Sequence, residues 1–268
     1  MPTYPRTAPG PFRADQIRDG DEYELSDGHA IRCVPAGIRH GSAQLDGGRV
    51  LASDPAVRGR VGIDIGVAWN NDKNLRAPDL VVGDFERGPG WLRSVPPLAV
   101  EYADTGQDEA ELTAKISELH AAGTRLVWVV RLTGPVRVDV HTRGEPMRTV
   151  GIDGELTAPG VLQNPVPVRA LVDPDAADAV SLRNLLQAHG YGSIEEIAAE
   201  GKAEGKAEGK VEGEKEALAR SILTVLGARG IAVSAAQAQQ IRDCSDPQRL
   251  ELWLRRAVTA ATVDALLD

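Results

Sequence analysis

Residues 75–131 decide the fold, and they read LRAPDLVVGD (75–84), PPLAVEYADTG (96–106), ELTAKISELHAAG (111–123) and TRLVWVVR (124–131). Short apolar runs bounded by proline, glycine and aspartate predict strands. The third segment repeats its apolar residues with helical spacing and ends at Gly123, a favoured helix C-cap residue. We therefore predict strands over 79–83, 98–103 and 126–130, with a helix over 107–122 between the last two.

Three charged residues lie at defined places in this region. Asp79 starts one strand, Glu101 interrupts the next, and Lys115 falls on the inward stripe of the helix between Leu112 and Leu119. A carboxylate inside an apolar strand is costly unless it is paired or bound to a metal. Carboxylates on neighbouring strands can hold a hard cation, and a bound Mg²⁺ can activate water against a phosphodiester.

The same residues also admit a purely structural interpretation. An aspartate after proline is common where a strand begins, and Glu101 could pair with an arginine. Lys115 has Glu111 four residues before it and Glu118 three residues after it, which is the spacing of surface ion pairs on a helix. Spacing alone leaves both interpretations open.

The flanking segments predict an α/β fold with a mixed sheet and flanking helices. Towards the N-terminus we expect a short helix over 13–18, a hairpin of residues 22–25 and 30–34, a short glycine-interrupted helix over 40–52, a strand over 61–69 and a polar turn over 70–76. Towards the C-terminus we expect a hairpin of residues 136–141 and 147–150, and an edge strand over 165–172.

Composition excludes several classes of protein. The net charge of −9 argues against a protein that binds nucleic acid along a whole basic face, although a local basic cleft is compatible with it. Cys33 and Cys244 have neither zinc-site nor disulfide-framework spacing, which fits a reducing compartment. The first residues lack the apolar core of a signal peptide, and no apolar run is long enough to cross a bilayer. We expect a cytoplasmic protein.

The chain changes character near residue 174. We predict a flexible arm over 1–12, a main domain over 13–173, a helix and linker over 174–217, and a small helical module over 218–268. The linker repeats EGKA with a period of four, so like charges are neighbours in a helix, and each glycine costs about 1 kcal/mol relative to alanine. It is either a long helix stabilised by a partner, as in a coiled coil, or a solvated tether.

The motifs RAPDLVVGD, PPLAVEYAD, the lysine of ELTAKISELHAAG and RLVWVVR resemble the Uma family of restriction-endonuclease-like proteins, in the PD-(D/E)XK nuclease superfamily. EYELSDG and PAGIRHG resemble the opening of that family. The resemblance extends from about residue 22 to residue 140. It departs from the family after Glu101, where a Ser-Pro-Ser type turn is replaced by Ala103-Asp104-Thr105-Gly106. The tail is similar in composition to extensions of other PD-(D/E)XK proteins.

The resemblance implies roles for particular residues. Asp79 and Glu101 would be metal ligands, Lys115 the catalytic lysine, and Glu24 an accessory ligand or a group that positions a base. His40 matches a family position without an assigned role. The implied cofactor is Mg²⁺, with Mn²⁺ as an alternative, and the implied substrate is nucleic acid, with DNA favoured.

Two classes of function therefore follow. The first is a Mg²⁺-dependent DNA endonuclease. The second is a weakly active or inactive scaffold with a nuclease fold, which assembles with a second copy or another protein through residues 200–268. Cleavage assays and the oligomeric state of the protein separate the two.

Overall fold

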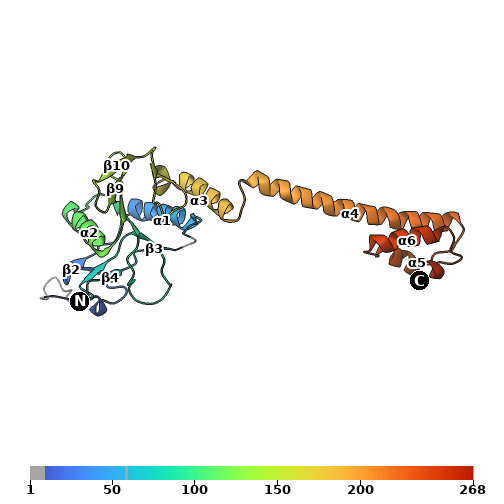
Figure 1. Ribbon diagram of the computed structural model, residues 1–268, viewed down its shortest axis with the longest axis horizontal. Helices are drawn as coiled ribbons and strands as arrows, with labels where there is room; N and C mark the ends of the chain where they lie inside the picture. Colours follow the sequence, from blue (N-terminus) through green and yellow to red (C-terminus); the bar gives the residue numbers. More distant parts are fainter. Residues whose placement is uncertain (1–9, 58–59, 268) are drawn as a thin grey trace. The chain divides into compact units, whose positions relative to one another are not determined.

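A computed structural model of the chain describes residues 10–57 and 60–267. It forms two compact units, Met1–Gly192 and Ser193–Asp268 (Figure 1). Each unit has its own hydrophobic core. Most of the arm predicted over residues 1–12 lies outside the described residues. The two units are treated separately below.

The centre of the first unit is a six-stranded mixed sheet with the order β10-β9-β8-β7-β6-β3. Only β7 and β8 run parallel, and the other neighbours are antiparallel. The predicted α/β fold with a mixed sheet is confirmed. The strands are β3 (Val61–Ile63), β6 (Leu80–Val82), β7 (Leu98–Ala103), β8 (Leu126–Arg131), β9 (Arg137–Thr142) and β10 (Arg148–Gly151).

Helix α2 (Glu109–Ala122) makes the crossover between the parallel strands. Asp108 caps its first turn, accepting from the amides of residues 110 and 111, and Gly123 ends it with a φ of 129°. Its buried residues Leu112, Ile116 and Leu119 pack on the sheet face that carries Ala99 and Ala103. Because side chains alternate along a strand, Glu101 lies on this face too, beneath α2.

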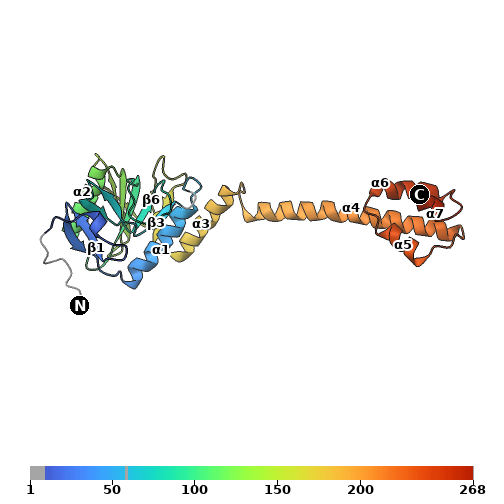
Figure 2. The same cartoon turned by 90° about the horizontal axis from the view of Figure 1, so that it is seen from below.

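The opposite face of the sheet is covered by α1 (Ile38–Ser53), α3 (Pro174–Ala188) and a short 3₁₀ helix, η3 (Val168–Leu171). Figure 2 shows α1 and α3 side by side. Val100, Tyr102 and Trp128 are buried on this face. A small antiparallel pair, β11 (Glu155–Leu156) and β12 (Val166–Pro167), leads into η3.

A second sheet, ordered β2-β1-β5-β4, adjoins the first. The predicted hairpin forms β1 (Tyr23–Ser26) and β2 (His29–Arg32), and β4 (Val67–Trp69) and β5 (Asn74–Arg76) complete the sheet. A 3₁₀ turn, η2 (Ala14–Gln16), packs against it. This sheet contributes Glu24 from β1 and Arg76 from β5.

Helix α1 differs from the short, glycine-interrupted helix that the sequence predicts. It runs unbroken over 16 residues. A Cβ added to Gly47 would lie 1.9 Å from the Tyr102 hydroxyl, whereas one added to Gly48 would make an ordinary contact of 3.4 Å with Leu80. Gly47 therefore allows close packing against the sheet rather than ending the helix.

Three other sequence predictions are wrong in detail. Residues 61–69 form two strands in different sheets, because the chain turns at Asp64, where φ is 51°. Residues 70–76 include the buried strand β5 after the turn, because Asn74 and Arg76 are buried through polar contacts that composition does not reveal. Residues 165–172 are mainly η3, with only Val166 and Pro167 extended.

The second unit is helical. Helix α4 (Ile194–Ala228) contains the whole repeat, and its C-terminal part packs against α5 (Ala235–Arg242), α6 (Pro247–Ala257) and α7 (Asp264–Leu267). Ile222, Leu250 and Trp253 are among its core residues. No helix in the described part of the chain has the length and apolarity that a membrane span requires.

Candidate active site

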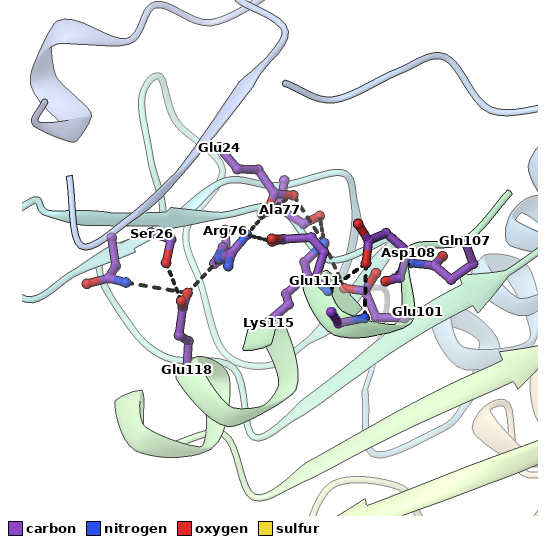
Figure 3. Close-up of polar contacts among 12 residues, drawn as sticks. Glu24, Ser26, Arg76, Ala77, Glu101, Gln107, Asp108, Glu111, Lys115 and Glu118 are labelled. Atoms are coloured by element: carbon purple, nitrogen blue, oxygen red, sulfur yellow. Dashed lines mark hydrogen bonds and ion pairs between the residues drawn. The ribbon is translucent and has the colours of Figure 1, made fainter. Parts of the chain in front are cut away.

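An open cleft of about 810 Å³ lies where α2, β7 and the second sheet meet. Asp79, Glu101, Lys115, Glu24 and His40 all line it. The structure thus brings together every residue that the sequence singled out as a candidate. Figure 3 shows Glu24, Glu101 and Lys115 together, with the polar contacts around them.

Lys115 reaches into the cleft from α2. Its Nζ lies 2.9 Å from Glu101 Oε1 and 3.1 Å from Glu24 Oε1, and it donates a hydrogen bond of 2.8 Å to the carbonyl of Ala77. Burial alone would lower the pKa of this amine, but the charges of Glu101, Glu24 and Asp79 outweigh burial and raise it. Lys115 is therefore an ammonium at neutral pH.

Glu101 is a buried carboxylate at the cleft floor, with a side chain only 10% exposed. Burial raises the pKa of Glu101, the Lys115 ammonium opposes this, and the neighbouring carboxylates of Asp79 and Glu24 add to the increase. A cation close to Glu101 would favour its ionised form.

Asp79 is held in place by two contacts. One carboxylate oxygen accepts a 2.5 Å hydrogen bond from the backbone N–H of Tyr102, and the other lies 3.3 Å from His40 Nε2. Its hydrogen bond with Asp79 raises the pKa of His40. The Asp79 contacts tie the start of β6 to β7, which also carries Glu101.

Glu24 is saturated by three donors. It accepts from Lys115 and Arg76 at 3.1 and 3.0 Å, and from the amide of Ala77 at 3.2 Å. Such a carboxylate is better suited to fixing Lys115 than to holding a cation itself.

Sequence reasoning missed three polar residues around the site. Arg76 is fully buried and binds Glu24, Glu111 and Glu118. Asp64 and Gln44 line the cleft, and Gln44 donates to both the Asp64 carboxylate and the Asp79 carbonyl at 2.9 Å. The arginine in RAPD, directly before the Pro-Asp pair, was the available signal. No local signal marks Asp64, because the alternating pattern of residues 61–69 predicts one continuous strand.

The turn that departs from the family pattern lies at the mouth of the cleft. Asp104 there forms an ion pair with Arg39, from the first turn of α1. This pair lowers the pKa of Asp104 to about 2. The turn therefore connects the first turn of α1 to the end of β7 through this ion pair.

The donor set fits a magnesium-like ion. Asp64, Asp79 and Glu101 bring three carboxyl groups to the cleft, and Lys115 is the cation in contact with Glu101. Burial and the nearby charge of Asp79 raise the pKa of Asp64. Within the described residues no three His, Cys, Asp or Glu side chains form a ready metal cluster. Mg²⁺ is commonly held by one or two carboxylates together with water and phosphate oxygens, so a two-carboxylate site is compatible with it.

Comparisons with known proteins give a consistent result. The Uma2 family model, described as "Putative restriction endonuclease", matches residues 12–166, more than half of the chain. None of the curated proteins matches. Among solved structures, the chain is similar to a "putative nuclease belonging to DUF820" from Anabaena variabilis. The two share 16% identity with a TM-score of 0.52, over 62% of this chain and 99% of that chain. That likeness shows a shared fold.

Proposed function

The chain belongs to the Uma2 family of restriction-endonuclease-like proteins, and we propose that it is a metal-dependent endonuclease acting on DNA. The observation that carries the proposal is the convergence of Asp79, Glu101 and Lys115 on one cleft, with Lys115 in contact with Glu101. These side chains come from the start of β6, from the neighbouring strand β7 and from the crossover helix α2.

Asp79 and Glu101 would hold a Mg²⁺ or Mn²⁺ ion. When bound, such an ion polarises a phosphodiester oxygen and lowers the pKa of water. The Tyr102 amide and His40 keep the Asp79 carboxylate fixed before any substrate arrives. Fixed charges of this kind stabilise a transition state without reorganising during the reaction.

Lys115 supplies the positive charge in this site. Its ammonium is fixed by Glu24 and the Ala77 carbonyl, so it is oriented before the substrate binds. It can then donate to a phosphate oxygen on which negative charge develops. Glu24 has the role of holding Lys115 rather than of binding the ion.

Two measurements on Asp79→Ala test this function. Plasmid cleavage with Mg²⁺ or Mn²⁺ should fall by roughly 10²–10³-fold, because one ligand and one fixed charge are lost. Calorimetric Mn²⁺ binding should weaken with it. Asp153→Ala, at an exposed turn, is the matched control and should cut like the wild type. If the wild-type protein cuts neither DNA nor RNA with either metal, the proposed endonuclease activity is refuted.

A second candidate function is assembly through the C-terminal unit. The family match ends before this unit begins. On α4, the glycines at 201, 205, 209 and 213 have nothing within 4 Å of an added Cβ, so no packing within the chain requires glycine there. Lys202, Lys206 and Lys210 form an exposed row along the same helix. Both features favour a partner helix outside the chain.

The oligomeric state of the protein tests this candidate. We expect the full chain to self-associate in light-scattering measurements, and the chain ending at Gly192 to be monomeric. Replacing Lys202, Lys206 and Lys210 by glutamate should dissociate the full-length assembly, because every charge in the row is reversed. Monomers for both the full and the truncated chain would remove the support for self-assembly.

A further inference from the structure

Lys115 does not have the ion-pair partners that its helix offers it. Glu111 and Glu118 lie four residues before it and three residues after it, at the spacing that places side chains side by side on a helix. In the structure, its ammonium instead pairs with Glu24 and Glu101, which belong to strands β1 and β7. Something must therefore compete for the two helical acids.

Arg76 occupies both of them. Its Nη1 lies 2.6 Å from Glu111 Oε1, and its Nε lies 2.6 Å from Glu118 Oε2 (Figure 3). The arginine comes from β5, and its side chain is 1% exposed. A guanidinium can hold several carboxylates at once because its donors form a rigid planar fork, whereas an ammonium is a compact point charge.

Arg76 also reaches Glu24, the residue that fixes Lys115. Nη1 lies 3.0 Å from Glu24 Oε2, while Lys115 binds the other oxygen, Oε1. The two cations thus divide the carboxylates between them. Arg76 takes the helical acids and one Glu24 oxygen, and Lys115 takes the second Glu24 oxygen and Glu101.

We propose that Arg76 is a positioning residue, which directs Lys115 into the cleft by occupying its helical partners Glu111 and Glu118. The expected effect on cleavage rests on the proposed function, whereas the effect on the ion pairs of Lys115 does not. Arg76 touches no reacting atom and acts through Lys115.

Removing Arg76 would change the balance of charge around Lys115. Glu111 and Glu118 would lose their cation, and both are more exposed than Glu24 and Glu101. Pairing near the surface costs less desolvation than pairing in the cleft. Lys115 would therefore turn to its own helix and leave Glu101.

The experiment follows the Lys115 ammonium directly. In protein with ¹⁵N-labelled lysine, its Nζ signal is identified by its loss in Lys115→Met, and its exchange with water is measured without metal or nucleic acid. In Arg76→Met, exchange should rise by roughly tenfold or more, because the ammonium leaves a protected site. DNA cleavage should fall while KM changes little, since the lost contact acts on the reacting phosphate.

A rescue variant separates positioning from general support of the fold. Arg76→Met combined with Glu111→Gln and Glu118→Gln removes the competing acids along with the arginine. Lys115 should return to Glu24 and Glu101, so slow exchange and cleavage should both be restored. This variant also leaves fewer unpaired carboxylates on α2, so we expect it to fold even if Arg76→Met alone does not.

Arg131→Met is the matched control. Arg131 likewise ties α2 to the sheet, through Glu109 and Asp139, but it lies away from Lys115. Its removal should leave Lys115 exchange unchanged. The inference would be overturned if the Lys115 ammonium exchanged as slowly in Arg76→Met as in the wild type, or if it exchanged fast in the triple variant. If the exchange results hold while wild-type protein cuts no nucleic acid, the proposed nuclease fails and the positioning role stands.

Discussion

The two units of the chain differ in the kinds of side chain that they bury. The first unit buries charged and amide side chains, including Glu24, Arg76, Glu101 and Asp139, beside its apolar core. Among the described residues of the second unit, the buried side chains are apolar, as with Ile222 and Trp253. Burying charge is costly unless each group is paired. Among the described residues, buried charges that are paired in this way lie in the unit that holds the cleft.

The largest expected effect is a loss of DNA cleavage on substitution of a cleft residue in the first unit. Lys115→Ala should reduce DNA cleavage by about 10²–10⁴-fold, since it deletes the ammonium beside Glu101. The free energy of unfolding of this variant should change by a smaller factor than its cleavage rate, because Glu24 keeps Arg76 as a partner. Plasmid nicking measures the loss of cleavage, and thermal unfolding of the same variant measures the change in stability. Substantial cleavage by this variant would remove Lys115 from the mechanism.

The second effect concerns stability of the helical unit. Trp253 is 3% exposed, with the Arg249 guanidinium 4.9 Å from its ring centroid. Trp253→Ala should destabilise this unit by about 3–5 kcal/mol. Amide hydrogen exchange in the full chain should show faster exchange in α5 and α6, with β7 and β8 unaffected. Equal loss of protection in both units would mean that they unfold together.

A pair of glycine substitutions should have opposite signs. Gly47→Ala in α1 should destabilise the first unit by about 1–3 kcal/mol, because its Cβ would collide with the Tyr102 hydroxyl. Gly201→Ala in α4, where the added Cβ meets open space within the chain, should stabilise that helix in the monomer by up to about 1 kcal/mol. Denaturant unfolding and helical circular dichroism measure the two. A destabilising Gly201→Ala would instead indicate that a partner helix packs against that glycine, as the self-assembly candidate expects.

The smallest effect is a difference in acid sensitivity. Burial would raise the pKa of Glu118 and Asp139, but Arg76 and Arg131 outweigh it and lower both. Carboxyls with a lowered folded-state pKa stabilise the protein above their unfolded pKa, near 4, and lose this as pH falls through the folded value. Below about pH 4 the first unit should therefore lose the stability that Glu118 and Asp139 supply, and lose more of it than the second unit does. Glu101 has a raised pKa, so it takes up its proton at higher pH and does not add to this loss. The ion pairs described in the second unit, such as Lys210–Glu214, are largely exposed and contribute little.

Much of the fold was determined by the sequence alone. The strand over residues 98–103, the helix ending at Gly123 and the hairpin after Leu25 follow from apolar periodicity and turn residues, which act locally. The family followed from short motifs in the same region, and the family model confirms it. The roles of Asp79, Glu101 and Lys115 remain predictions, although the structure places all three in one cleft.

Tertiary structure decided what depends on contacts between distant residues. Gly47 lies inside a helix because the Tyr102 hydroxyl comes close to it, which no local pattern shows. The chain turns at Asp64 because its two halves join different sheets. Above all, the direction of Lys115 was undecided between its helical neighbours and the cleft. Arg76 settles it, since a buried arginine 39 residues earlier holds both helical acids.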